Sequence, residues 1–195
     1  VILLFLCALR AFVVIYGTVE LLRNRGVPMN VGDFNFHRPG TLDEAISMLS
    51  KFENAAVMAG GTDILVEIKK EKRNHPDLIS LSNVNEIKSF TEDENFFYIG
   101  AGMTHSEVIA SGILRKNLSA LPEALSKIGS GQIRNRGTIG GNLCSAASCC
   151  DSAPILMAMD ARVELRSIAE TRKISLRLIR QTAAIIIVSS MKKIK

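Results

Sequence analysis

Two glycine clusters contain the residues of this chain whose types and spacing best suit the binding of a ligand. Residues 58–65 read MAGGTDIL, and residues 136–143 read RGTIGGNL. Consecutive glycines let several backbone N–H groups point the same way and let a ligand approach the main chain. Such groups bind anions, phosphates above all, and a helix that begins after the loop strengthens the attraction. The clusters predict a phosphate site to which both loops contribute, with Thr62 and Thr138 as hydroxyl donors, although two tight turns would give the same pattern.

Other chemical motifs are absent from the sequence. Neither GxGxxG at a strand-to-helix turn nor GxxxxGK[ST] occurs. No acid–base pair or nucleophile stands at a persuasive spacing, so we predict no catalytic residue. The histidines are scattered and are interpreted as surface or loop residues, and no Cys/His cluster has metal-ligand spacing, so we predict no metal site. These histidines are His37, His75 and His105.

The cysteines indicate a reducing compartment. The adjacent Cys149 and Cys150 are unsuited to an ordinary structural disulfide, and no CxxC pair occurs. We therefore predict a cytoplasmic location. The pair itself has two interpretations, a redox-active couple or two small side chains that fill a tight loop.

The elements that must position the clusters alternate between strands and helices. A short strand at 55–58 leads into the first cluster and a short helix at 64–70 follows it. Helices at 42–52 and 104–111 each begin with a capping box, formed by Thr41 with Glu44 and by Thr104 with Glu107. Further strands are expected at 78–81, 96–100 and 162–165, a helix at 119–128, and a long glycine-rich stretch over 129–142. This irregular alternation predicts a mixed α+β domain.

Composition and charge exclude several classes of protein. The 195 residues are 47% hydrophobic, which excludes wholesale disorder, and they are only 5% aromatic with no Trp, which disfavours base stacking. The net charge of +5 belongs to the ends of the sequence. Residues 162–195 hold nine Lys and Arg against two Glu, for a net charge of +7, whereas residues 29–161 are acidic at −4. A solvated basic end explains this better than a nucleic-acid-binding arm, so we predict no nucleic acid partner.

Residues 1–28 form an apolar leader with three interpretations. The interpretations are a packed helix, a poor membrane anchor, and a stretch of sequence that lies upstream of the true start at Met29. Arg10 near the middle of the apolar run is costly for a membrane span. No positive region precedes the run as it would in a signal peptide. We favour the third interpretation and predict no membrane association.

The motifs around both glycine clusters resemble a known family. AGGTD at 59–63 is followed by Ile64-Leu65-Val66. The second block continues as QIRN (132–135), TIGGN (138–142), Ser148, Asp151, Pro154, Asp160-Ala161 and VEL (163–165). In order and spacing these residues are similar to the FAD-binding subunit of the molybdenum hydroxylases, which include xanthine dehydrogenase, the medium subunit of carbon monoxide dehydrogenase and nicotinate-type dehydrogenases. The resemblance extends from about Met29 to Ser175.

The resemblance implies a fold, a cofactor and a set of contacts. The fold is the two-lobed α+β FAD-binding domain of the vanillyl-alcohol oxidase (PCMH) type, partial over 29–175 with the second lobe incomplete, followed by a divergent basic tail at 176–195. The cofactor is FAD. For Asp151 a turn or N-cap role before Pro154 is the alternative. The implied cofactor-binding residues are Val57, Met58, Ala59, Gly60, Gly61, Thr62, Asp63, Ile64, Ala101, Thr138, Ile139, Gly140, Gly141, Asn142, Ser145 and Asp151.

The resemblance also implies a role in electron transfer. A molybdenum-cofactor subunit would hydroxylate the substrate, a 2Fe–2S subunit would pass on the electrons, and NAD would accept them from FAD. The chain would then be an oxidoreductase subunit. The alternatives are a non-catalytic phosphate- or nucleotide-binding module with a basic tail, or an inactive fragment of such a subunit. An FAD-dependent oxidase of the same fold would need a substrate cap, for which 195 residues are too few.

Overall fold

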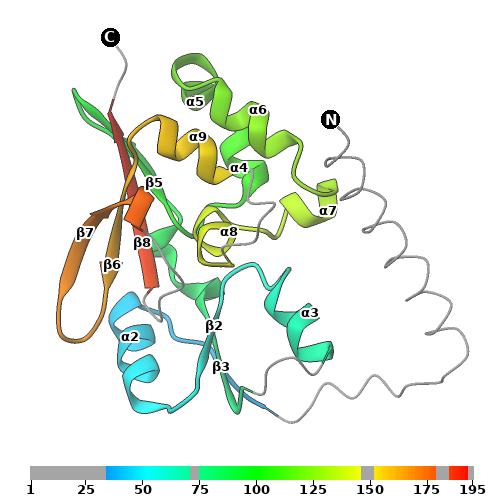
Figure 1. Cartoon of the computed structure of the whole chain (residues 1–195). Coiled ribbons are helices and arrows are strands. Elements are labelled where there is room, and N and C mark those ends of the chain that lie inside the picture. Colours follow the sequence, from blue (N-terminus) through cyan, green and yellow to red (C-terminus); the bar gives the residue numbers. More distant parts are fainter. Residues whose placement is uncertain (1–33, 71–74, 146–151, 179–184, 193–195) are drawn as a thin grey trace, which may run out of the picture. The chain divides into compact units, whose positions relative to one another are not determined.

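The computed structural model describes residues 34–70, 75–145, 152–178 and 185–192, the last range and Leu178 by their main chain alone. These residues form a three-stranded and a five-stranded sheet with helices packed on both (Figure 1). The predicted α+β class is confirmed. The apolar leader at 1–28 lies outside the described residues, and within them no helix is long and apolar enough to cross a membrane.

The three-stranded sheet is parallel and carries a helix on each face. Its strands lie in the order β1-β3-β2. Neighbouring residues of a strand point to opposite faces. On β3, Ile79 packs with Leu42 of α2, whereas Leu78 packs with Ile68 of α3. The elements are β1 (Asn35–His37), α2 (Leu42–Lys51), β2 (Ala56–Met58), α3 (Ile64–Lys69) and β3 (Asp77–Ser80).

Helix α2 begins where the sequence predicts it. The Thr41 Oγ1 accepts a hydrogen bond from the Glu44 N–H at 3.2 Å, and the Glu44 carboxylate accepts one from the Thr41 N–H at 3.4 Å. The predicted capping box therefore closes. The same box opens α4 (His105–Ala110), where Thr104 pairs with Glu107.

The five-stranded sheet is antiparallel in the order β4-β5-β8-β6-β7. Strand β8 (Ile185–Lys192) therefore lies in the middle of the sheet, between strands that are far apart in the sequence. The segment at 176–195, expected as a basic tail, contains this strand. Its run of Ile and Val suits a strand, since β-branched residues favour extended backbone. The other strands are β4 (Phe90–Glu92), β5 (Phe96–Gly100), β6 (Arg162–Arg166) and β7 (Thr171–Ser175).

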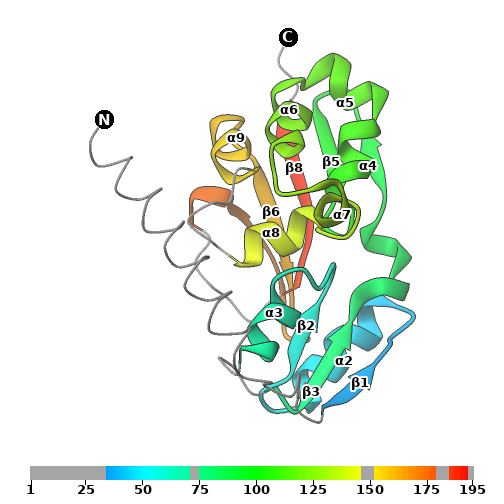
Figure 2. The same cartoon turned by 90° about the vertical axis from the view of Figure 1, so that its right-hand side faces the viewer.

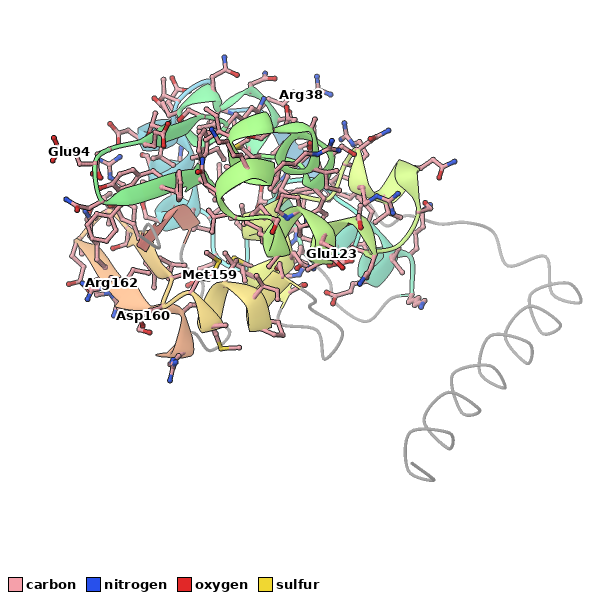
Figure 3. The ribbon with its side chains drawn as sticks, turned by 90° about the horizontal axis from the view of Figure 1, so that it is seen from above. Arg38, Glu94, Glu123, Met159, Asp160 and Arg162 are labelled. Atoms are coloured by element: carbon pink, nitrogen blue, oxygen red, sulfur yellow. The ribbon has the colours of Figure 1, made fainter. Side chains whose placement is uncertain are left out.

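Helices cover one face of the five-stranded sheet (Figure 1 and Figure 2). The core between them joins Ile99 and Val163 of the sheet to Val108, Leu121 and Leu156 of the helices, all fully buried. Besides α4, these helices are α5 (Gly112–Asn117), α6 (Ala120–Ser126) and α9 (Ser152–Ala158). Figure 3 shows Met159, Asp160 and Arg162 together where α9 leads into β6, a turn in which Asp160 has a φ of 50°.

The glycine-rich stretch at 129–142 is largely helical, which the sequence did not predict. It contains α7 (Gly131–Arg134) and the start of α8 (Ile139–Ser145). Glycine is a poor helix former. Hydrogen bonds to another loop compensate, because the Ile139 and Gly140 N–H groups donate to the carbonyl oxygens of Met103 and Ala101. In both views α8 lies between the helices on the larger sheet and the three-stranded sheet (Figure 1 and Figure 2).

Candidate functional site

The two glycine clusters meet. Gly60, in the first cluster, lies against the main chain of the second at Arg136 and Gly137. A Cβ on Gly60 would overlap the Arg136 carbonyl oxygen and lie 2.7 Å from its carbon. Only glycine allows this approach. The structure thus brings together segments that are far apart in the sequence.

The second cluster is attached to the loop that leads from β5 to α4. The Ile139 N–H donates to the Met103 carbonyl at 3.0 Å, and the Gly140 N–H donates to the Ala101 carbonyl at 2.8 Å. In return, the His105 N–H donates to the Gly137 carbonyl at 2.9 Å. A Cβ on Gly140 would lie only 2.6 Å from the Ala101 Cβ. The β5–α4 loop therefore fixes the position of the second cluster.

Most backbone N–H groups of the second cluster are already used within the protein, but that of Thr138 has no acceptor among the described residues. Besides the bonds of Ile139 and Gly140, the Gly141 N–H donates to the Thr138 Oγ1 at 3.1 Å and the Asn142 N–H to the Thr138 carbonyl at 2.9 Å. In the first cluster, by contrast, the N–H groups of residues 59–64 have no acceptor among the described residues. The backbone donors available to an anion therefore belong mainly to the first cluster, to which the second adds the Thr138 N–H.

Both clusters line one cleft with a volume of about 480 Å³, a size typical of small-molecule sites. Of the residues predicted to bind a cofactor, most line it. Met58 and Ile139 instead pack into hydrophobic cores and do not line the cleft. Asp151 lies outside the described residues, as do Cys149 and Cys150. The predicted residues that line the cleft are Val57, Ala59, Gly60, Gly61, Thr62, Asp63, Ile64, Ala101, Thr138, Gly140, Gly141, Asn142 and Ser145.

Polar side chains hold the far end of α8. The Ser152 hydroxyl, at the start of α9, donates to the Asn142 Oδ1 at 2.5 Å, and the Ser145 hydroxyl donates to the Asn142 carbonyl at 3.0 Å. Ser152 is completely buried. The first bond ties α8 to α9, and the second lies within α8.

Sequence reasoning missed several residues of the lining, and His105 is the most informative of them. The interpretation of this histidine as a surface or loop residue is wrong. It is the first residue of α4 and is only 2% exposed, because the second cluster covers it. The signal that pointed to it was its place directly after Thr104 in a capping box. The other missed lining residues are Leu49, Ala55, Ala56, Glu67, His75, Leu81, Ile87, Ile128, Ile133, Gly137 and Cys144.

The charge of the lining favours a site built on main-chain donors. Its ionised side chains are the carboxylates of Asp63 and Glu67, and the described lining residues include no Lys or Arg. A phosphate here would depend on N–H groups. The two carboxylates supply acceptors for hydroxyl groups such as those of a ribose or a ribityl chain.

His105 is the titratable group that the fold perturbs most clearly within the cleft. Burial lowers the pKa of His105 below its usual 6.5. The Asp63 carboxylate opposes this effect on the pKa, and the Arg134 guanidinium adds to it. The imidazole is therefore neutral at physiological pH.

The chain matches the model of a known protein family. Residues 32–183 match the FAD binding domain in molybdopterin dehydrogenase, so the chain belongs to this family. It is similar to the nicotinate dehydrogenase FAD-subunit of Eubacterium barkeri, with 36% identity over 74% of this chain and 49% of that protein. It is also similar to the xanthine dehydrogenase FAD-binding subunit of Escherichia coli O157:H7, with 34% identity over 68% of this chain and 46% of that protein.

A solved structure is also similar to this chain in fold. Reconstituted CO dehydrogenase from Oligotropha carboxidovorans contains a chain that superposes with a TM-score of 0.80 and 25% identity, over 84% of this chain and 60% of that one. The predicted family and FAD as its cofactor are confirmed. The relatives are dehydrogenase subunits, in agreement with the predicted oxidoreductase class. The chain spans about half the length of the two relatives.

Proposed function

We propose that this chain is the FAD-binding electron-transfer subunit of a molybdenum-containing hydroxylase of the xanthine dehydrogenase type. Its partners would be a molybdenum-cofactor subunit and a 2Fe–2S subunit, with NAD as the electron acceptor, in the cytoplasm. The two-lobed PCMH-type arrangement, incomplete in its second lobe, is part of this proposal. The family match and the names of the relatives support it.

One observation carries the cofactor assignment. The glycine clusters, far apart in the sequence, contact each other at Gly60 and line the same cleft. The open N–H groups of residues 59–64 face no acceptor of the described chain, which is what a bound pyrophosphate requires. The residues present therefore fit FAD.

The residues of this chain bind and orient the cofactor. The N–H groups of residues 59–64 would receive the pyrophosphate, while the second cluster forms the opposite wall and gives shape more than donors. Asp63 and Glu67 would accept hydrogen bonds from hydroxyl groups of the cofactor. When bound, FAD supplies the hydride and electron chemistry itself, and for this reason we assign no catalytic residue to the chain.

FAD uptake tests the proposal. The full chain is purified without flavin and titrated with FAD, and binding is followed by the two visible absorption bands of oxidised flavin and by quenching of its fluorescence. ADP and riboflavin are titrated separately. Tighter binding of FAD than of riboflavin supports a site for the pyrophosphate. A chain that folds but binds neither FAD nor ADP would refute the proposal.

The basic-tail alternative, a phosphate-binding module that recognises nucleic acid or a membrane, receives less support. Residues 185–192 form β8 within the five-stranded sheet, so they do not extend away from it as a free arm. Deletion of 166–195 would remove β7, β8 and the last residue of β6 together with the basic residues. Charge substitutions at Arg172 and Lys173, both exposed on β7, test this alternative without that damage.

A further inference from the structure

One side chain in the lining has an unusual environment that the cofactor assignment above does not use. Both His105 and its ring nitrogen Nδ1 are buried, and Nδ1 has no hydrogen-bond partner among the described residues. Buried polar atoms nearly always have a partner, so an exception calls for an explanation. The environment of Nδ1 decides which ring nitrogen of His105 carries the proton.

The opposite edge of the ring faces the second cluster. A Cβ on Gly137 would lie 3.0 Å from the His105 Cδ2 and 3.2 Å from its Nε2. Both Gly137 and His105 line the cleft. Nε2 is not among the buried atoms that lack a partner. Because Nδ1 is sealed, a molecule in the cleft would have to contact the ring at its other edge, which carries Nε2.

The burial of Nδ1 fixes the tautomer. A proton on Nδ1 would be a buried N–H without an acceptor, which is among the rarer defects of folded proteins. The neutral ring avoids this defect by carrying its proton on Nε2. The surroundings of Nδ1 thus decide which of the two nitrogens is protonated. Ionisation would need a proton at both positions, which agrees with the lowered pKa of this residue.

We propose that His105 binds the cofactor directly, as a neutral imidazole whose Nε2–H donates a hydrogen bond to an acceptor atom of FAD. This inference rests on the proposed FAD site. It gives the second wall of the cleft a side-chain donor, whereas the N–H groups of residues 139–142 are used within the protein. The missing side chain of Gly137 makes room for the ring.

A matched pair of substitutions separates a donor at Nε2 from general packing. The amide nitrogen of Gln reaches about as far as Nε2, whereas that of Asn stops near the place of Nδ1. We expect His105→Gln to bind FAD nearly as tightly as the natural chain. We expect His105→Asn to bind roughly 3- to 10-fold more weakly, the effect of one neutral hydrogen bond. Equal affinities of the two variants would overturn the inference.

A second measurement needs no variant. In the ¹⁵N NMR spectrum of the natural chain, which has three histidines, His105 should show a protonated Nε2 and an unprotonated Nδ1, and the Nε2 signal should shift when FAD is added. A proton on Nδ1, or an imidazolium in the FAD complex, would overturn the inference while leaving FAD binding intact. Absence of any FAD binding would instead refute the proposed function, and the inference with it.

Discussion

Gly60 lies directly against the carbonyl group of Arg136, with no room between them for a side-chain carbon. This contact joins the loop that follows β2 to the segment that precedes α8. The atoms that a Cβ would meet are main-chain atoms, which cannot rotate away as a flexible side chain does. The shape of the cleft therefore depends on the absence of a side chain at this position.

Gly60→Ala should destabilise the protein and open the cleft. Overpacking of this kind costs about 1–3 kcal/mol, and FAD affinity should fall because the two walls move apart. Urea denaturation and FAD titration measure the two effects. The control is Gly112→Ala, where an added Cβ meets nothing within 4 Å, and which should leave both quantities nearly unchanged. Equal behaviour of the two variants would show that the contact is unimportant.

Gly140→Ala should also destabilise the protein, and Ala101→Gly should partly rescue it. The nearest atom to the new Cβ would be the Ala101 Cβ at 2.6 Å, followed by the Ala101 carbonyl oxygen at 2.9 Å. Removal of the first leaves the second, so the rescue is incomplete. A double-mutant cycle should give a coupling of about 0.5–3 kcal/mol, and strict additivity would contradict the packing described.

The two capping boxes should differ in their effect on binding. Thr41→Ala and Thr104→Ala each remove an N-cap and should each lower the free energy of unfolding by about 1 kcal/mol. The main chain of Thr104 also pairs with that of Thr138, so loss of the cap would loosen α4 at the point where it meets the second cluster. We therefore expect only Thr104→Ala to weaken FAD binding. Thermal denaturation and flavin titration of both variants check this, and a loss of affinity in Thr41→Ala would contradict it.

The stability of the protein should decrease below about pH 6.5 in a way that depends on His105. Since burial lowers the pKa of this residue in the folded state, the unfolded chain binds a proton first as the pH falls. The stability contributed by the neutral ring is thus complete above the unfolded pKa and is lost below it, until the folded pKa is reached. Chemical denaturation between pH 7.5 and 5 should show a smaller decrease for His105→Gln than for the natural chain. Parallel curves would exclude this source.

Local signals predicted much of the fold. Both capping boxes form as expected, and β2, α3, β3 and β5 lie within a residue or two of the expected ranges. Such elements depend on neighbouring residues, which the sequence displays directly. The resemblance added the family and about half of the residues that line the cleft. The motif predicts residues of the cleft because the glycines that define it stand where the two walls of the cleft approach each other.

Long-range contacts were harder to predict. The helical start of α8 depends on carbonyl oxygens of Ala101 and Met103, and no local pattern indicates that they are available. The burial of His105 depends on Gly137 lying over its ring. The central position of β8 is likewise a matter of pairing with β5 and β6, both distant in the sequence. In each case the partner, and not the segment itself, decides the structure.

The strand order of the five-stranded sheet also constrains the order of folding. Strands β4 and β5 can pair as soon as they are synthesised, and so can β6 and β7, but the two pairs share no edge until β8 inserts between them. A nascent chain in which these pairs had formed would therefore carry two half-sheets with open edges until residues 185–192 emerge. Exposed strand edges are sites of aggregation, so we expect the protein to be most prone to aggregation before β8 is made.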